Sequence, residues 1–292
     1  METNIINQHY VWRHYLKPWL TDGKIWCARD GKIFKRNIEK LAKEKYFYKA
    51  EPLNDNEKQI IQSVIASMDS LGHDLLNNTF SIYIEASNGS EFERNNSIES
   101  YHSFIEKCAI PILDCLYKDD FKFLENDLSK TIFASFIASQ YTRTKKGRDS
   151  ITMAFQAISH LHDYPENINT DKIGNVLALI LAESIGNWIF TDAKLSILEN
   201  KSSIGFLTSD QPVYNLHANT SEELIPINDF ELFYPITPQK ALILKRELHN
   251  EEDVDVNHYN NFIISVAREY IFAKTEEELQ FYFKDVNTIN LS

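Results

Sequence analysis

The spacing of hydrophobic residues changes once along the chain, and this change limits the folds that the sequence can adopt. From about residue 56 to residue 190, apolar residues recur at intervals of three and four, the spacing of helices with a buried face. From residue 196 to residue 244, they form short runs separated by turn residues, as in an antiparallel meander. Helices and strands that are segregated along a chain favour an α+β fold.

A pair of short strands near the N-terminus extends the predicted sheet. Residues 24–28 and 32–36 flank Arg29-Asp30-Gly31, and Asp-Gly supplies the positive φ angles of a tight hairpin turn. We expect this hairpin and the C-terminal strands to share one small, mainly antiparallel sheet, on which a predominantly helical middle packs. With only 8 glycines in 292 residues, both a tight-turned all-β barrel and a Gly-rich phosphate loop are disfavoured.

We predict a single domain over residues 1–292, because the sequence shows no repeat, no low-complexity tract and no Pro/Ser-rich linker. Its parts are the N-terminal motif and hairpin (1–50), a helical region (51–192), and strands with terminal helices (193–292). Gly72 is expected to end a helix, residues 76–97 to form a loop, and Pro111 to break or kink a helix that starts near Ser97. The other expected helices span residues 37–45, 56–71, 127–143, 149–162, 171–190 and 256–273, with a short one capped by Thr275 and Glu278.

Charge and targeting signals narrow the class of partner. The net charge is −12, so general attraction to nucleic acid is not expected. The basic run from Arg143 to Arg148 could form a local patch, but a solvated helix end is the simpler interpretation. The start lacks a signal-peptide pattern, and the most apolar run, residues 176–182, is too short to span a bilayer. We therefore expect a cytoplasmic protein that does not contact a membrane.

The opening segment, Asn7-Gln8-His9-Tyr10-Val11-Trp12-Arg13, has an unusual density of polar groups among aromatic residues. If it is helical from about Tyr10, His9 and Arg13 lie on one face. An imidazole that exchanges protons near neutral pH and a guanidinium that neutralises charge together suit the binding or cleavage of a phosphate. Spacing alone favours a simpler role, in which both side chains bond backbone groups and hold the N-terminus against the fold.

This opening resembles the NxHYVPR-type start of the domain-of-unknown-function family 4238, and the resemblance covers most of the chain. Residues 136–144 are similar to a family helix that contains Gln and Arg, and residues 206–213 are similar to its TSDxPV strand end. Residues 234–238 match a YPLSP-like segment, and Asn260, or its neighbour Asn261, stands where the last helix of the family has Asn. The chain departs from the family at Trp12, which replaces a proline that shapes the backbone.

The resemblance implies one polar site assembled from the whole chain. The candidate catalytic residues are His9, Asp210 and Gln140, and the candidate phosphate- or substrate-binding residues are Arg13, Arg143, Tyr10 and Asn260. The competing interpretation is a buried polar network in which these side chains satisfy one another. No cofactor and no metal are expected, because His160-Leu161-His162-Asp163 is too common a pattern to indicate a metal site.

Two functions fit this candidate site. The first is an enzyme that acts on a phosphodiester or nucleotide, such as a nuclease of a bacterial phage-defence or toxin-type system. In it, His9 is the general acid or base, Asp210 orients His9, and Arg13 and Arg143 hold the phosphate of a nucleic acid or nucleotide. The second is a non-catalytic sensor or regulatory module that binds a small ligand or a protein partner in the same pocket. Metal-dependent hydrolysis ranks below both, because no second carboxylate accompanies Asp210 at a recognisable spacing.

Overall fold

The computed structural model describes residues 4–68, 72–159, 165, 167–217, 230–247 and 254–283. The chain divides into two compact units, each assembled from segments that are far apart in the sequence. We call them the helical unit (residues 1–8, 44–143 and 147–191) and the mixed unit (residues 9–43, 144–146 and 192–292). The predicted α+β class is confirmed, because long helices occur together with small antiparallel sheets. The single domain stays a prediction.

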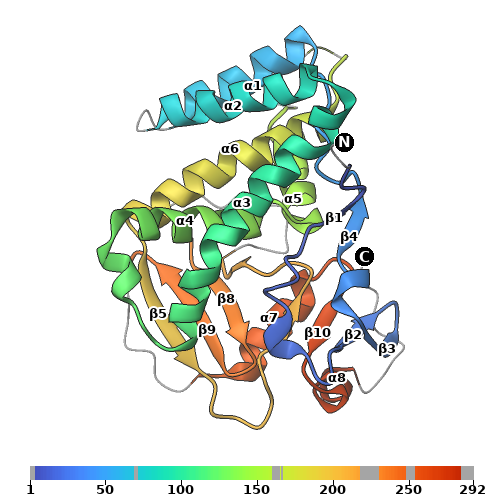
Figure 1. Ribbon diagram of the computed structural model, residues 1–292, viewed down its shortest axis with the longest axis vertical. Helices are drawn as coiled ribbons and strands as arrows, with labels where there is room; N and C mark the ends of the chain where they lie inside the picture. The colour runs from blue at the N-terminus through green and yellow to red at the C-terminus, as the bar shows by residue number, and fades with distance from the viewer. Residues whose placement is uncertain are drawn as a thin grey trace. The chain divides into compact units, whose positions relative to one another are not determined.

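The helical unit is organised around one apolar helix, α6 (Thr170–Thr191). α6 packs against α4 (Asp127–Thr142), α2 (His73–Asn88) and α1 (Asp55–Ser67). α3 (Glu91–Tyr117) packs against α2 and α4, and α1 lies alongside α2 (Figure 1). A 3-10 helix (Lys122–Glu125) precedes α4, and most of α5 (Lys145–Ser159) belongs to this unit. The helices predicted at residues 127–143 and 171–190 are confirmed.

By length and composition alone, α6 could cross a membrane. However, 61% of its most apolar window is buried inside the protein, and Ile173, Val176 and Ile180 are completely inaccessible to solvent. The central helix of a soluble protein meets the same criteria of length and composition. The burial therefore indicates a core helix, and no membrane is suggested.

The loop predicted at residues 76–97 is wrong, because this segment forms most of α2 and the start of α3. Leu76, Phe80 and Tyr83 recur at helical spacing and are buried on one side of α2. The polar residues between them face away from this contact and outnumber them, so the amphipathic pattern is weak in the sequence. Packing of this narrow apolar face is what decides the helix.

The predicted boundaries around α3 are also wrong. Gly72, with a φ of 122°, precedes α2 rather than ending α1, which stops at Ser67. α3 begins at Glu91, because Ser90 and Glu93 form its capping box. The predicted break at Pro111 does not occur, since α3 continues through it to Tyr117.

The first sheet of the mixed unit joins the N-terminal hairpin to C-terminal strands, as predicted. Its order is β3-β2-β10-β6, and all its neighbours are antiparallel. Asp30 and Gly31 have φ angles of 47° and 72°, the geometry of a type I′ turn, in which Gly removes the steric cost. The strands are β2 (Ile25–Arg29), β3 (Lys32–Arg36), β6 (Thr208–Ser209) and β10 (Ile271–Ala273).

The remaining C-terminal strands form a second antiparallel sheet of order β5-β9-β8-β7. The strands predicted between residues 196 and 244 are confirmed, and most of them lie in this sheet. Residues 208–209 instead form β6 of the first sheet. The C-terminal strands are thus divided between two sheets. The members of the second sheet are β5 (Lys194–Glu199), β7 (Tyr214–Asn215), β8 (Leu232–Thr237) and β9 (Lys240–Lys245).

The helix predicted at residues 256–273 is wrong in its second half. α7 (Val256–Val266) ends early, and the chain enters β10 after a short connection. The short helix predicted next is confirmed as α8 (Glu276–Tyr282), with Thr275 and Glu278 forming its capping box.

The N-terminal segments contain little regular helix. β1 (Asn7–His9) pairs with β4 (Lys43–Lys45). The helix predicted at residues 37–45 is wrong, because only one 3-10 turn (Ile38–Lys40) precedes β4. Tyr10 and Val11 form a bend, followed by a turn and a 3-10 helix (Lys17–Trp19). His9 and Arg13 therefore do not share a face of an α-helix.

Candidate functional site

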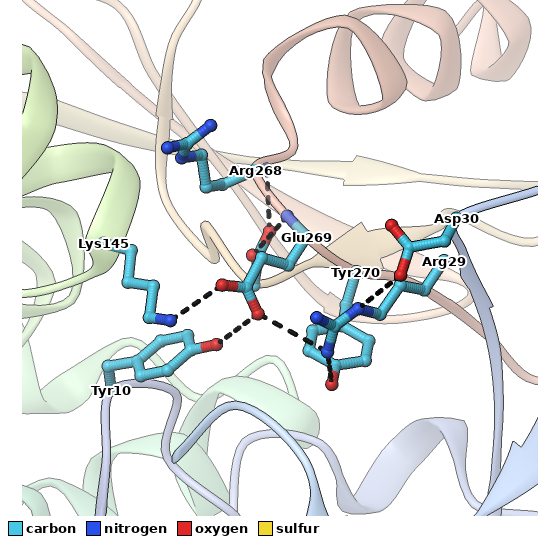
Figure 2. A network of polar contacts seen from close by, with 8 residues as sticks. Tyr10, Arg29, Asp30, Lys145, Arg268, Glu269 and Tyr270 are labelled. Atoms are coloured by element: carbon cyan, nitrogen blue, oxygen red, sulfur yellow. Dashed lines mark hydrogen bonds and ion pairs between the residues drawn. The ribbon is translucent and has the colours of Figure 1, made fainter. Parts of the chain in front are cut away.

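Glu269 lies at the centre of a polar network in the mixed unit (Figure 2). Its carboxylate accepts a hydrogen bond of 2.7 Å from Lys145 Nζ and one of 3.3 Å from the Tyr10 hydroxyl. The guanidinium of Arg29 forms an ion pair with the same carboxylate at 3.7 Å. These groups come from three distant parts of the chain, and we call them, with Tyr270, the Glu269 network.

Asp210 holds the connection between α7 and β10 on which Glu269 lies. Its carboxylate accepts hydrogen bonds from the backbone N–H groups of Arg268 (3.0 Å) and Glu269 (2.7 Å), and its own N–H donates to the carbonyl of Tyr270 (3.1 Å). Asp210 is fully buried, and burial raises its pKa to about 6 against the opposing effect of the backbone hydrogen bonds. Asp210 thus fixes the backbone of Glu269. It connects the TSDxPV-like strand end to the Glu269 network.

The segment that contains Lys145 is attached to the same region. The Thr144 hydroxyl donates a hydrogen bond to the side chain of Gln211, the residue after Asp210. Lys145 Nζ also lies 5.2 Å from the centre of the Tyr10 ring, a cation–π contact. The hydrogen bond of Thr144 and the ring of Tyr10 therefore both help to position Lys145 beside Glu269.

The two tyrosines of the network have different hydrogen-bonding roles: Tyr10 donates and Tyr270 accepts. Burial, reinforced by the negative charges of Asp210 and Glu269, raises the pKa of Tyr10 far above its usual range. Tyr10 therefore stays protonated and serves as a hydrogen-bond donor. Tyr270 accepts a hydrogen bond from Arg29, whose guanidinium also lies 4.6 Å from its ring centre. Burial alone would lower the pKa of Arg29, but Tyr270 and Glu269 outweigh it and raise the pKa.

Solvent reaches part of the network. The side chains of Lys145 and Glu269 are 24% and 25% exposed, and that of Arg29 is 37% exposed. Tyr10 is buried. A ligand from solution could therefore contact the two cations and the carboxylate. The buried Tyr10 contacts Glu269 and Lys145 from within the protein.

Other predicted site residues of the mixed unit contact other parts of the chain. His9 is half-buried, and its Nε2 lies 3.4 Å from the carbonyl oxygen of Glu39. Arg13 is exposed, and Trp12 stacks on His14. Asn260 is completely buried, where it accepts a hydrogen bond from Leu207 N–H and donates to the carbonyl of Gly205 and to Tyr282. These bonds tie α7 to the segment that leads into β6.

The other two predicted residues belong to the helical unit. Gln140 in α4 is completely buried, and Arg143, which follows α4, is 2% exposed and forms an ion pair with Glu106 of α3. Tyr10 and Asp210 thus both contact Glu269, whereas Gln140 and Arg143 lie in the helical unit. The assignment of catalytic and binding roles to the predicted residues stays a prediction.

Sequence reasoning missed three members of the Glu269 network. Arg29 was interpreted as a hairpin residue, and Glu269 and Tyr270 lay inside a predicted helix. Lys145 was noted only as part of a basic run. A signal existed in the tripeptide Arg268-Glu269-Tyr270, whose charges interrupt an otherwise apolar run just before Ile271 and Phe272.

Within the part of the chain that the structure describes, no group of three or more His, Cys, Asp or Glu side chains is arranged to hold a metal ion. The pattern at residues 160–163 lies outside the described residues. The three cysteines, Cys27, Cys108 and Cys115, are free thiols.

A family model described as a protein of unknown function, DUF4238, matches residues 7–277. No curated protein and no solved structure matches the chain. The family match includes every residue of the Glu269 network.

Proposed function

The chain belongs to the DUF4238 family of proteins of unknown function, and we propose that the Glu269 network is the active site of an enzyme acting on phosphodiesters or nucleotides. The proposal rests on one observation: an ammonium, a guanidinium and a phenol converge on a single, partly exposed carboxylate. The same donors suit the oxygens of a phosphate group, since Lys and Arg are the side chains that most often bind phosphate.

Phosphate binding would also activate Glu269. In the structure, Lys145 and Arg29 contact the carboxylate oxygens of Glu269. A phosphate that attracts both cations would free these oxygens to accept a hydrogen bond from a water molecule. Binding of the substrate therefore prepares the base.

The proposed reaction is hydrolysis at phosphorus. Glu269 takes a proton from a water molecule as its oxygen bonds to phosphorus, and Lys145 and Arg29 stabilise the added negative charge. The bond from phosphorus to the leaving oxygen breaks, and this oxygen takes a proton from His9, our candidate general acid. Asp210 acts through the backbone of Glu269 as a positioning residue, which replaces our earlier hypothesis that it orients His9.

The proposed substrates are nucleic acid or a nucleotide, and we propose a cytoplasmic enzyme of a bacterial phage-defence or toxin-type system. Support comes from the residue types of the network, which are those of phosphoryl chemistry. Gln140 as a catalytic residue and Arg13, Arg143 and Asn260 as substrate-binding residues remain further proposals.

The alternative function is a non-catalytic sensor module that binds a small ligand or a protein. Two observations favour it: each charge of the network already has a partner, and the net charge of −12 opposes the approach of long polyanions. In this alternative, the ligand binds Lys145 and Arg29 but leaves the protein unchanged.

The first test is a cleavage assay with Glu269→Gln. The purified protein is incubated with labelled RNA, labelled DNA and nucleoside triphosphates, with and without added divalent metal. We expect the wild type to hydrolyse at least one substrate and Glu269→Gln to lose about 100-fold or more in rate, the usual contribution of a general base. Lys145→Met should raise KM and also lower kcat, because Lys145 both binds the phosphate and stabilises the charge added in the transition state.

The matched control is Glu277→Gln, the same change at an exposed position of α8, which should keep the wild-type rate. Circular dichroism of each variant separates loss of chemistry from loss of fold. Wild-type rates in Glu269→Gln would contradict the proposed active site. Binding of a phosphate compound that depends on Lys145, without turnover of any substrate, would instead establish the sensor alternative.

A further inference from the structure

Four side chains of the helical unit have buried polar atoms that lack a hydrogen-bond partner among the described residues. They are His102 of α3, Gln140 of α4, Arg143 after α4, and Arg148 of α5. The atoms are His102 Nε2, Nε of each arginine, and both the oxygen and the nitrogen of the Gln140 amide. We call these four residues the buried cationic cluster; none of them belongs to the Glu269 network.

Shared neighbours relate three members of the cluster, and the fourth, Gln140, follows Ser139 in α4. His102 Nδ1 lies 3.0 Å from Ser139 Oγ, and one helical turn further along both helices Arg143 pairs with Glu106. The ring of Tyr48 lies 4.7 Å from the ring of His102 and 4.9 Å from the guanidinium of Arg148. His102, Arg143 and Arg148 therefore lie close enough to interact electrostatically, and Gln140 lies in α4 beside a residue that contacts His102.

Core packing does not explain why a glutamine occupies position 140 of α4. Its side chain is completely buried, and its neighbours along α4, Phe136 and Ile137, are apolar core residues. A buried amide with neither its donor nor its acceptor satisfied destabilises a fold, and an apolar side chain of the same length would fill the space without that cost. Polar residues that lower stability in this way are typical of ligand sites.

Among the described residues, one cation of the cluster, Arg148, has no carboxylate in direct contact, although the charge of Glu44 also acts on it. Arg143 has Glu106 as its ion-pair partner, while Arg148 donates to the backbone carbonyl of Phe47. Burial raises the pKa of the nearby Glu99 to about 7, although Arg143 opposes this, so Glu99 is only partly charged at neutral pH. Burial, with the repulsion of both arginines, holds the pKa of His102 well below its usual value, and its ring is neutral.

We propose that the buried cationic cluster binds a small phosphate-bearing anion. The planar guanidinium edges of Arg143 and Arg148 match phosphate oxygens, and the Gln140 nitrogen adds a third donor. The Gln140 oxygen accepts a hydrogen bond from a protonated phosphate oxygen or from an N–H of an attached base. This site is separate from the Glu269 network, with which it shares no residue, and it requires no reaction. It gives Gln140 and Arg143 a role in binding alone, as an alternative to the catalytic and substrate-binding roles proposed for them above.

The test is isothermal titration calorimetry of the full chain with two probes, inorganic phosphate and adenosine monophosphate. Saturable binding of phosphate alone identifies a free-phosphate site, and tighter binding of the monophosphate identifies a nucleotide site. Gln140→Met should weaken binding about tenfold or more, the effect of losing hydrogen bonds to a charged ligand. Without ligand, the same variant should unfold at a higher temperature than the wild type.

Arg148→Lys keeps the charge but removes Nε and the planar edge, so we expect it to weaken binding as well. Gln62→Met, at an exposed position of α1, is the control and should bind like the wild type. The proposal is overturned if neither probe binds, or if Gln140→Met and Arg148→Lys both bind as tightly as the wild type. Loss of binding in Glu269→Gln but not in Gln140→Met would assign the anion to the Glu269 network and equally overturn it.

Discussion

Asp210 illustrates how a motif residue can act through the backbone. Its position in a TSDxPV-like strand end suggests a side chain presented to a substrate, yet its carboxylate binds the amides of Arg268 and Glu269. Burial makes its charge costly, and the pKa of about 6 reflects this cost. The carboxylate is nevertheless suited to the task, because one side chain with two acceptor oxygens holds two consecutive N–H groups.

The raised pKa of Asp210 predicts a pH dependence of stability. A carboxyl group whose folded pKa lies above its unfolded value favours folding while it is protonated, and this contribution is lost as the pH rises from about 4 to about 6. Over that window, the contribution amounts to roughly 3 kcal/mol. Asp210→Asn cannot ionise, so its free energy of unfolding should decline less than that of the wild type between pH 4 and pH 7.

Urea denaturation at several pH values measures this difference. When the free energy of unfolding of Asp210→Asn is subtracted from that of the wild type, the contributions of the carboxyl groups that both proteins contain, including Glu99, cancel. Parallel stability profiles for wild type and Asp210→Asn would show that the folded pKa of Asp210 is not raised.

At the level of elements, capping decides boundaries that hydrophobic spacing leaves open. Two pairs compete for the start of α3 in the sequence, Ser90 with Glu93 and Asn96 with Glu99, and the helix uses the first. Asn96 lies within α3, where its side chain donates to the carbonyl of Phe92 and accepts a hydrogen bond from Ile5 N–H. The earlier start is stabilised because Asn96 thereby joins the N-terminal segment to α3.

Ser90→Ala should therefore destabilise the protein by about 1 kcal/mol, the typical effect of deleting an N-cap. Ser97→Ala is the matched change inside the helix and should be neutral or slightly stabilising, because Ala has the higher helix propensity. Chemical denaturation of both variants tests the boundary. The reverse order of stability would indicate a helix that begins near Ser97.

At the scale of the whole molecule, each unit is built from segments that are interleaved along the chain. In the mixed unit, β2 lies between β3 and β10, although β10 is the last strand among the described residues and β2 belongs to the N-terminal hairpin. Trp19 donates a hydrogen bond to the carbonyl of Phe206, and Tyr15 bonds Thr208. The C-terminal region thus obtains a sheet partner and large core side chains from residues 9–43.

A fragment of residues 192–292 should consequently fail to fold alone, because β10 loses β2 and the core loses Tyr15 and Trp19. We expect its circular dichroism to show no cooperative thermal transition. A single chain in which a flexible linker joins residues 9–43 to residues 192–292 should regain one. Cooperative unfolding of the isolated fragment would show that its own contacts suffice.

The sequence by itself determined the features that depend on neighbours along the chain. The α+β class, the hairpin at Asp30 and Gly31, the long apolar helix α6 and the cap of α8 all follow from periodicity and local turn or capping chemistry. The family could also be recognised, because its opening motif is contiguous. In each case, the decisive residues lie within a few positions of one another.

Tertiary structure alone decided that α7 ends at Val266 and that Glu269 meets Lys145, Arg29 and Tyr10. Ile271 pairs with Ala28, and Asp210 accepts hydrogen bonds from the backbone of Arg268 and Glu269. These contacts outweigh the helical spacing of residues 256–273. Local propensities differ by fractions of a kcal/mol per residue, whereas a strand pair and buried hydrogen bonds act together. Contacts between residues so distant in the chain leave no periodic trace in the sequence, so the network appears only once the chain is folded.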